Sequence, residues 1–359
     1  MAIEARAYTI PTDAPEADGT LVWDKTTIVV VHARDGDASG LGWTYGDAST
    51  AALIARTLGP VVERDASVLA PQAAWEAMAR ALRNVGHSGP GAMALAAVDT
   101  ALWDLKARVV GLPLCDLLGA VRDHVPLYGS GGFTSYDVER LQQQLGGWAD
   151  AGFTRVKLKV GSDPDADPMR VRAARASVGE AVELFVDANG AYTRAQALRL
   201  AETFASECDV RWFEEPVPSD DRDGLRWLRD RVPAGMEIAA GEYVWTLADA
   251  RALLDAGAVD ALQADVTRCG GITELLRIDA LCRAARLPLS LHCAPALHAH
   301  PALALSQLAH LEFFHDHARV EAMLFDGVPQ PRGGVLRPQR DRPGNGMELR
   351  TADAERWAA

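Results

Sequence analysis

The stretch VELFVDANGAYTRAQALRLAETFASECDVRWFEEP, residues 182–216, decides the fold of this chain. It begins with an apolar, strand-like run (182–190), continues with the spacing of an amphipathic helix, and ends in a second strand-like run (211–216). A strand, a helix and a strand in this order predict a βαβ unit, which builds a parallel sheet. Each run carries a carboxylate near its end, Asp187 and Glu214, so the same stretch holds candidate chemistry.

The same alternation continues on both sides of this stretch. Eight strand-like runs are separated by roughly one helix each: VPLYGSG (125–131), RVKLKVG (155–161), VELFVDANG (182–190), RWFEEP (211–216), EIAAGE (237–242), ALQADV (261–266), LPLSLHC (287–293) and LEFF (311–314). Eight such repeats predict a (β/α)₈ barrel.

The residues outside the predicted barrel indicate a smaller α+β unit. Residues 27–32 are β-branched and apolar and predict a strand, bounded by the turn-rich segment 35–42. Residues 49–83 have helical spacing, and 92–110 predict a strong helix that ends at Gly111. The tail after about residue 325 is rich in Gly, Pro and Arg, so we expect irregular structure or short strands that return to this unit.

Composition argues against several classes of function. With 36 Lys+Arg against 49 Asp+Glu, the net charge is -13, and so acidic a chain makes a poor binder of nucleic acid. The five cysteines are scattered, odd in number and without a CxxC pair, which indicates reduced thiols. There is no signal-peptide pattern and no apolar run of the roughly 18–20 residues that a membrane span needs. We therefore expect a soluble, cytoplasmic protein without a membrane partner.

Ionisable residues recur near the ends of the predicted strands. Successive members are 20 to 28 residues apart, which is about the length of a βα unit: Lys159, Asp187, Glu214, Glu242, Asp265, His292 and Glu312. They should therefore lie at one height, at the C-terminal rim where barrel active sites are built.

Three of these residues predict a metal site. Carboxylates that converge from adjacent strands, here Asp187, Glu214 and Glu242, suit Mg²⁺, which prefers oxygen ligands. Strand alternation places Asn189 on the same face as Asp187. Of the neighbours Glu214 and Glu215, by contrast, only one should point inward.

The remaining rim residues predict acid/base chemistry. Lys157 and Lys159 share one face of a strand, and a neighbouring ammonium should lower the pKa of Lys159 towards that of a general base. Asp265 precedes His292 by one strand and can fix its tautomer. Lysine on one side and histidine on the other would flank the α-carbon of a substrate.

Each of these residues has a plainer interpretation. A single carboxylate at a strand end is usually a helix cap or a surface charge, a lysine pair is usually solvated, and a single buried histidine is usually part of the core. The recurrence of all of them in one rhythm favours a site. A second cluster, His298, His300, His310, His315 and His317, suggests a transition-metal site, but we interpret it as loop or substrate contact. Trp43 and Tyr45, in the Gly-rich segment GWTYG, are either anchors of the smaller unit or substrate-closing residues.

In their order along the chain, these motifs resemble the enolase superfamily, and within it the mandelate racemase subgroup. The matching motifs are KxK at 157–159, DxN at 187–189, ExP at 214–216, GE at 241–242, QADVTRCGGIT at 263–273, the strand end at His292, and Glu312. The helix ALAAVDTALWDLKARVVGLPLCDLLG at 94–119 is also similar to the N-terminal signature of the family. The resemblance covers essentially the whole chain.

This resemblance implies a (β/α)₇β TIM-like barrel with an α+β capping domain. We expect the N-terminal capping domain at 1–122, the barrel at 123–325, and a C-terminal segment at 326–359 that returns to the cap. It also implies one Mg²⁺ per subunit on the three carboxylates and a symmetric homo-oligomer. Lys159 and the pair His292–Asp265 would be the two acid/bases, and Glu312 would donate a hydrogen bond to the substrate carboxylate. Enolase-superfamily enzymes already provide the precedent of a Lys or His base with magnesium.

The expected reaction is removal of the α-proton of a small carboxylate, with Mg²⁺ and Lys157 supplying positive charge where the enolate develops. Arg268 stands where the muconate-lactonizing branch has a second catalytic lysine, and an arginine stays protonated. His292 therefore favours the mandelate racemase branch and dehydration of an acid sugar to a 2-keto-3-deoxy acid. A racemase, epimerase or cycloisomerase on the same scaffold, and a barrel without catalysis that only binds, are the alternatives. Specificity should come from the cap loops 11–23 and 40–47 and from rim residues such as Ser130.

Overall fold

The barrel predicted from the sequence is present in the computed structural model, which describes all 359 residues apart from the side chain of Asp65. Its parallel strands follow one another around the barrel in chain order: β4 (Val125–Gly131), β5 (Arg155–Lys159), β6 (Glu183–Asp187), β7 (Val210–Glu214), β8 (Glu237–Ala240), β9 (Ala261–Ala264), β10 (Leu289–Leu291) and β11 (Leu308–Phe314). Because β11 also pairs with β4, the sheet closes. All eight predicted strands are confirmed.

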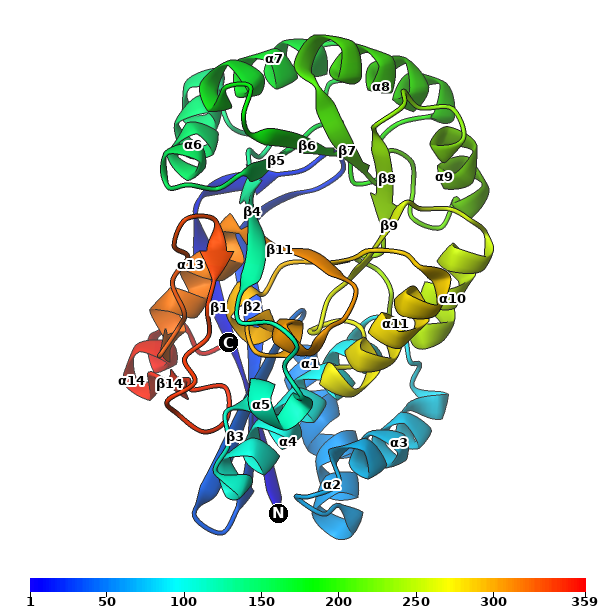
Figure 1. Cartoon of the computed structure of the whole chain (residues 1–359). Coiled ribbons are helices and arrows are strands. Elements are labelled where there is room, and N and C mark those ends of the chain that lie inside the picture. Colours follow the sequence, from blue (N-terminus) through cyan, green and yellow to red (C-terminus); the bar gives the residue numbers. More distant parts are fainter.

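Helices separate consecutive strands and lie on the outside of the barrel (Figure 1). They are α6 (Val138–Asp150), α7 (Asp167–Val178), α8 (Arg194–Cys208), α9 (Arg222–Arg229), α10 (Leu247–Asp255) and α11 (Ile272–Ala285), followed by the short α12 (Pro295–His298) and η3 (Pro301–Ala304), and by α13 (His315–Leu324). Their apolar sides pack on the barrel because crossover helices cover the faces of parallel sheets. The fold is thus a TIM-like barrel, as expected.

The capping domain combines a three-stranded antiparallel sheet with helices. The sheet contains β1 (Ala2–Ala17), β2 (Val22–Asp35) and β3 (Ala38–Tyr45). The helices are α1 (Ser49–Leu53), η1 (Ile54–Leu58), α2 (Gly59–Asp65), α3 (Pro71–Ala81), η2 (Leu82–Asn84), α4 (Pro90–Val110) and α5 (Leu114–Leu118). The predicted helix at 92–110 is confirmed as α4, and Gly111 ends it with φ +77°. The expectation of a loop at 11–23 is wrong in part, because β1 extends to Ala17 and β2 begins at Val22.

The segment around Trp43 and Tyr45 is a strand, not the loop that its glycines suggested. A Cβ on Gly40 would lie 2.2 Å from the Ala101 carbonyl, and one on Gly42 would lie 2.3 Å from Thr100 Oγ1. These glycines therefore let β3 approach α4 closely, which is a packing role and not a turn role.

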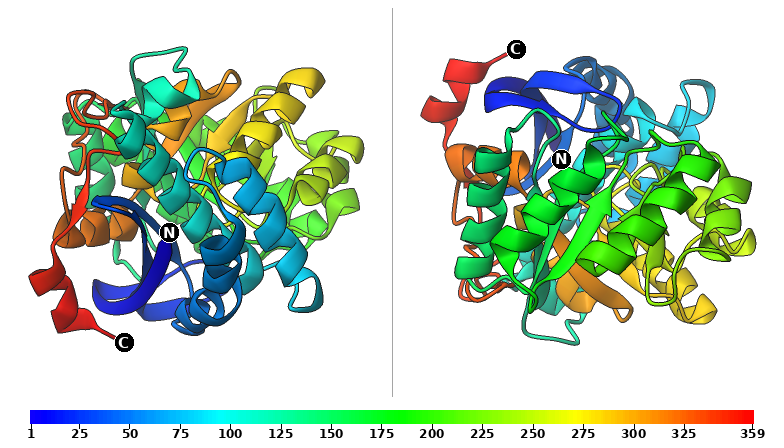
Figure 2. Two further views of the ribbon diagram at one scale, coloured as in Figure 1. Left: turned by 90° about the horizontal axis from the view of Figure 1, so that it is seen from below. Right: turned by 90° about the horizontal axis from the view of Figure 1, so that it is seen from above.

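The C-terminal segment crosses from the barrel to the cap, as expected. It contains β12 (Phe325–Asp326), β13 (Val335–Leu336), β14 (Glu348–Leu349), α14 (Thr351–Ala354) and η4 (Glu355–Trp357). Its end lies beside the β1–β2 hairpin in both views of Figure 2, where Ala358 forms a bridge with Tyr8. Strand β13, in turn, pairs antiparallel with β4 of the barrel.

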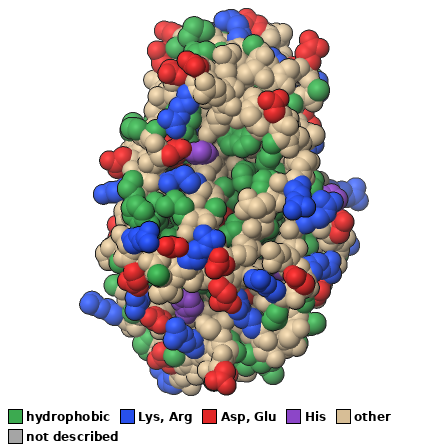
Figure 3. Space-filling model, turned by 90° about the vertical axis from the view of Figure 1, so that its left-hand side faces the viewer, with side chains coloured by type: hydrophobic (Ala, Val, Ile, Leu, Met, Phe, Trp, Pro, Cys, Tyr) green, Lys and Arg blue, Asp and Glu red, His purple; other side chains and the backbone are tan. Residues whose placement is uncertain are grey.

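The surface carries both signs of charge. On the face shown in Figure 3, basic and acidic side chains are interspersed, and hydrophobic side chains gather in a central hollow. Each of the five cysteines is a buried free thiol. Among the described residues, no helix combines the length and apolarity needed to cross a bilayer.

Candidate active site

Three carboxylates meet at the C-terminal rim of the barrel. Asp187 ends β6, Glu214 ends β7, and Glu242 follows β8 by two residues. The register pairs Lys159 with Asp187 and Asp187 with Glu214, so these residues lie at one height. One ligand atom from each of the three carboxylates lies within 4.8 Å of the others, and all three side chains are buried. The predicted convergence is therefore confirmed.

Lys157 lies beneath these carboxylates and contacts two of them through its ammonium group. Its Nζ lies 2.7 Å from both carboxylate oxygens of Glu214 and 2.9 Å from Glu312 Oε1, and its side chain is fully buried. Burial alone would lower the pKa of Lys157, but Glu214 and Glu312 outweigh it and raise the pKa. Lys157 is thus a fixed positive charge beneath the site.

Lys159 lies above it and lines the cavity at the rim. Its Nζ donates to Asp187 Oδ2 at 2.5 Å. The expectation of a lowered pKa is wrong for this arrangement. Burial and Lys157 do lower the pKa of Lys159, but the carboxylates of Asp187, Glu242 and Glu214 together outweigh them, and the pKa is raised.

Glu215 corrects the expectation that only one of the two neighbouring glutamates points inward. Both Glu214 and Glu215 are buried. Glu215 has φ +36°, a conformation that interrupts strand alternation. Burial, followed by Glu242 and Asp187, raises its pKa, so Glu215 shares the surroundings of the metal carboxylates.

His292 and Asp265 form the expected pair. His292 Nδ1 lies 2.9 Å from Asp265 Oδ2, while His292 Nε2 lies 3.3 Å from Glu242 Oε2. Asp265 also accepts hydrogen bonds from the backbone N–H and hydroxyl of Thr267. Arg268 approaches Glu242 at 3.4 Å. Burial lowers the pKa of His292, but the surrounding anionic groups outweigh it, and the net shift is upward.

Glu312 accepts hydrogen bonds, contrary to its expected role as a donor. Ser130 Oγ donates to its Oε1 at 2.5 Å, and the backbone N–H of Cys293 donates to its Oε2 at 3.0 Å. Burial would raise the pKa of Glu312, but Lys157, His292 and Lys159 together outweigh it and lower the pKa. An ionised carboxylate has no proton to donate, so the donor role does not fit this arrangement.

A cavity of about 210 Å³ opens onto these groups. Lys159, Asn189, Glu242, Arg268, His292 and Glu312 line it from the barrel. The cap contributes Asp18, Leu21, Trp23 and Thr26 from the β1–β2 hairpin. The expectation that segment 11–23 reaches the site is therefore confirmed, whereas segment 40–47 contributes no lining residue.

Three of the predicted substrate residues lie behind this lining. Ser130 is buried against Glu312. Trp43 is fully buried and stacks on Phe325, with ring centroids 4.4 Å apart. Tyr45 stacks on His317, which does line the cavity, at 3.5 Å. Trp43 therefore anchors the cap, and Tyr45 supports a lining residue from behind.

Four lining residues were not anticipated from the sequence, either singly or within a named cap segment: Thr26, Tyr243, Cys293 and Phe314. Tyr243 and Cys293 directly follow a predicted rim residue, and that adjacency is the one signal that could have found them. Thr26 carries no such signal, since it reaches the site only when the cap folds over the barrel.

The histidine cluster does not form a single site. His298 Nε2 accepts from the Val266 backbone N–H, and His310 Nδ1 lies 2.9 Å from Ser290 Oγ. Burial lowers the pKa of His310 to about 3. His315 lies 3.1 Å from Asp13. The interpretation against a transition-metal site made of these histidines is consistent with these separate partners.

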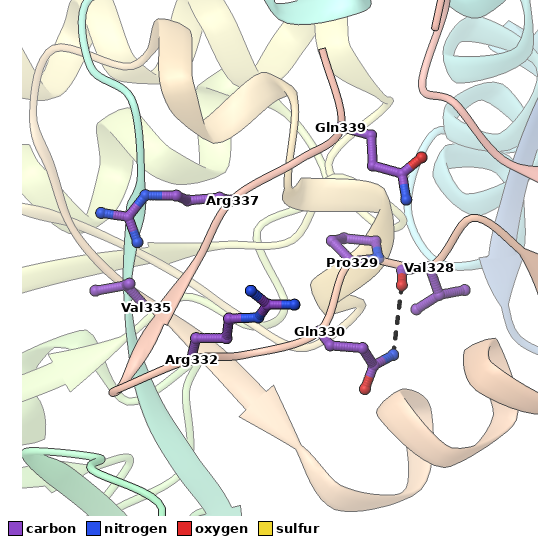
Figure 4. A pocket seen from close by; sticks show the side chains of 7 residues that line it. All are labelled: Val328, Pro329, Gln330, Arg332, Val335, Arg337 and Gln339. Carbon is purple, nitrogen blue, oxygen red and sulfur yellow. Dashed lines mark hydrogen bonds between the residues drawn. The ribbon is translucent and has the colours of Figure 1, made fainter. Parts of the chain in front are cut away.

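Two larger cavities lie away from the C-terminal rim. One of about 310 Å³ is lined entirely by residues between Val328 and Gln339, and Figure 4 shows its two arginines, Arg332 and Arg337, with no carboxylate or histidine among the lining side chains. Another, of about 470 Å³, lies at the N-terminal end of the barrel strands, whereas active sites of this fold lie at the C-terminal end.

The rim site fits a divalent cation. Its buried carboxylates outnumber the cationic side chains around them: Asp187, Glu214, Glu215, Glu242, Asp265 and Glu312 face Lys157, Lys159, Arg268 and His292. Burial and the neighbouring Asp187 raise the pKa of Glu214 to about 8, which is the signature of crowded negative charge. Hard oxygen donors at this density suit Mg²⁺.

Comparison with known proteins agrees with the site. The model of the enolase C-terminal domain-like family matches residues 140–354, and the model of the mandelate racemase / muconate lactonizing enzyme N-terminal domain matches residues 11–119. The chain is 34% identical to a 3,6-anhydro-alpha-L-galactonate cycloisomerase of Streptomyces coelicolor, over 90% of this chain and 89% of that protein. It is 33% identical to an L-rhamnonate dehydratase of Saccharopolyspora erythraea, over 90% and 83%.

Solved structures are similar over the whole chain. A mandelate racemase/muconate lactonizing enzyme-like protein from Rubrobacter xylanophilus superposes with a TM-score of 0.98 at 58% identity, covering 100% of this chain and 99% of that one. A racemase from Streptomyces coelicolor with bound magnesium superposes with a TM-score of 0.92 at 30% identity, covering 99% of each.

Proposed function

Because the chain belongs to the mandelate racemase / muconate lactonizing enzyme family of the enolase superfamily, we propose that it is an enzyme that dehydrates an acid sugar. The reaction removes the proton next to the carboxylate and expels the 3-hydroxyl, which leaves a 2-keto-3-deoxy acid. The single observation that carries the proposal is the cavity in which Lys159 and the His292–Asp265 pair meet the metal carboxylates.

His292 is one acid/base in this proposal. Asp265 accepts from Nδ1 and so leaves Nε2 as the nitrogen that exchanges a proton with the substrate. Since the pKa of His292 is raised, the imidazole begins protonated and can give its proton to the leaving hydroxyl. Arg268 stays protonated beside it and contributes charge but no proton transfer.

Lys159 is the other acid/base. It comes from β5, whereas His292 follows β10, so the two approach the cavity from different parts of the barrel wall. Asp187 holds its Nζ in place. When Mg²⁺ is bound at Asp187, Glu214 and Glu242, it supplies positive charge to the substrate carboxylate and offsets the negative charge that raises the pKa of Lys159. Lys157 lowers the pKa of Glu214 and Glu312 beneath the site and holds both carboxylates in position.

Substrate contacts come from both domains. We assign Asn189 to the substrate because its Oδ1 is buried without a hydrogen-bond partner among the described residues and the residue lines the cavity. Glu312 would orient the substrate as an acceptor of sugar hydroxyls. Trp23 and Leu21 would cover it from the hairpin.

Incubation with a panel of aldonic and aldaric acids and Mg²⁺, followed by an assay for 2-keto acids, tests dehydration. Formation of a 2-keto acid from at least one panel member is expected. Exchange of the α-proton with solvent deuterium, without loss of water from any member, would contradict it.

A racemase, epimerase or cycloisomerase is the second candidate. The observation in its favour is the presence of two acid/bases in one cavity, which a two-base inversion requires. The similar Streptomyces coelicolor proteins, a cycloisomerase and a racemase, support it. Deuterium at the α-carbon of an isomerised product, with no 2-keto acid formed, would select this reaction.

A cytoplasmic location and a homo-oligomeric assembly complete the proposal. The five free cysteines support a reducing compartment. Light scattering on the purified protein tests the assembly, and a mass equal to one chain would contradict it.

A further inference from the structure

A second group of potential metal ligands lies outside the catalytic cavity. It consists of Asp13 and Glu16 on β1 and His315, the first residue of α13. We propose that these three side chains bind a divalent transition-metal ion such as Zn²⁺ and thereby hold the β1–β2 hairpin against the barrel. This site goes beyond the proposed catalytic function and does not depend on it.

The geometry is close to that of a bound ion. One ligand atom from each residue lies within 4.8 Å of the other two. Asp13 Oδ2 and His315 Nε2 are already 3.1 Å apart. A tetrahedral zinc site with ligands at about 2.0 Å holds its donor atoms about 3.3 Å apart. A small movement of the Glu16 carboxylate towards Asp13 and His315 would therefore supply the third ligand.

Glu16 provides the second, independent observation. Its side chain is fully buried, although it carries a carboxylate. Trp23 Nε1 donates to Oε2 at 2.8 Å, but Oε1 has no hydrogen-bond partner in the part of the chain that the structure describes. A buried carboxylate oxygen without a partner is costly, and a cation would remove that cost. Burial, helped by Asp316, raises the pKa of Glu16 to about 8, so a proton is the competing occupant.

The donor set selects the class of metal. Two carboxylates and one imidazole suit zinc and similar transition metals, whereas magnesium prefers oxygen donors and retains water. The side chains of Asp13 and His315 are 39% and 26% exposed, which leaves room for a water ligand. Arg140 approaches the other oxygen of Asp13 at 3.4 Å, so Oδ2 stays directed at His315.

The position of the site connects it to the catalytic cavity. Two ligands belong to the hairpin, and the third directly follows Phe314, which lines the cavity. Glu16 is paired with Trp23 across the hairpin and accepts its hydrogen bond, and Trp23 also lines the cavity. An ion at this site would therefore fix the hairpin in the position that covers the substrate.

Zinc binding by the full-length protein tests the proposal. The chelator-treated protein is equilibrated with saturating Mg²⁺ and a limited excess of Zn²⁺, dialysed against Mg²⁺, and analysed for zinc by mass spectrometry. We expect about one zinc per chain, and a loss of at least tenfold in zinc affinity for Asp13→Asn and for His315→Gln. Both residues are partly exposed, so these variants should fold, which circular dichroism verifies.

Two control variants separate this site from other histidines. His124 and Asp123 form another histidine–carboxylate pair, with Nδ1 2.6 Å from Oδ1. This pair lies outside the proposed site, so His124→Gln should retain the zinc. His292, Cys293 and Glu312 also lie within 4.8 Å of one another, so zinc lost in Cys293→Ser but kept in His315→Gln would assign it to the cavity and overturn the proposal. Less than 0.2 zinc per chain in the unaltered protein would overturn it as well. Because the readout is bound metal, failure here leaves the dehydratase proposal untouched.

Discussion

Asp265 Oδ2 lies 2.9 Å from His292 Nδ1, one strand away at the rim of the barrel. This contact connects two residues that are 27 positions apart in the sequence and orients the only other nitrogen of the imidazole towards Glu242. It is the relationship on which the proposed acid/base chemistry most directly depends.

Replacing Asp265 by Asn should therefore lower kcat by about 10²–10⁴-fold, with a smaller effect on KM. The amide can donate to Nδ1 and favour the wrong tautomer, and the loss of the negative charge lowers the pKa of His292. The measurement is the pH profile of kcat. Asp123→Asn, at the exposed His124 pair, should leave the profile unchanged; a wild-type profile for Asp265→Asn would contradict the assignment.

Removal of Lys157 should destabilise the fold itself. Lys157→Met leaves the buried carboxylates of Glu214 and Glu312 without their partner, which we expect to cost about 3–5 kcal/mol in the free energy of unfolding. Urea titration measures this. The exposed Lys25→Met should change stability by less than about 0.5 kcal/mol, and equal effects of the two variants would refute the structural role.

Magnesium should stabilise the protein through the three rim carboxylates. At a concentration 100-fold above its Kd, a ligand that binds only the folded state adds about 2.7 kcal/mol. We expect Mg²⁺ to raise Tm in the unaltered protein and to have little effect on Glu242→Gln. Excess chelator should abolish turnover reversibly; turnover that persists in chelator would exclude the magnesium requirement.

Gly42 should not tolerate alanine, because a Cβ would lie 2.3 Å from Thr100 Oγ1 and 2.4 Å from the Ala97 carbonyl. Gly42→Ala should cost at least about 1–3 kcal/mol as β3 and α4 are forced apart. Gly147, on the exposed side of α6, has nothing within 4 Å of its Cβ position. Gly147→Ala should instead stabilise by up to about 1 kcal/mol, and thermal denaturation compares the two.

Asp99 should make stability depend on pH. It is fully buried and accepts hydrogen bonds from the backbone N–H and hydroxyl of Thr273, where cap helix α4 meets barrel helix α11. Burial raises its pKa to about 7. The folded state therefore holds a proton that the unfolded state has lost, and the contribution of Asp99 decreases as the pH rises from about 4 to 7. Relative to Asp99→Asn, the unaltered protein should lose free energy of unfolding across this window; parallel curves would contradict the raised pKa.

The sequence predicted the barrel because its signal is local and repeated. Each run from 125–131 to 311–314 has the length and composition of a buried strand, and the repeat of rim residues from Lys159 to Glu312 follows directly from that periodicity. The contact of His292 with Asp265 could be predicted in the same way, since neighbouring strands in a parallel barrel place equivalent residues side by side.

Other features could not be predicted because their cause is not local. The glycines at 40 and 42 look like turn residues, but they are needed because α4 approaches closely, and its contacting residues, 97–105, lie more than 50 positions further along the chain. Glu215 enters the site through φ +36°, which strand alternation does not anticipate. Thr26, outside the predicted segment 11–23, reaches the cavity only through the position of the hairpin.

By itself, then, the sequence determined the barrel, the three carboxylates and the positions of the two proposed acid/bases, since strand periodicity alone brings them to one rim. Only the tertiary structure decided the charge state of those groups. The pKa of Lys159 was expected to be low beside Lys157, but the neighbouring carboxylates, Asp187 foremost, outweigh both burial and Lys157 and raise it. Lys157, His292 and Lys159 lower the pKa of Glu312, which leaves it an acceptor. The physical reason is that electrostatic energies depend on distances and burial in three dimensions, and residue spacing along the chain specifies neither.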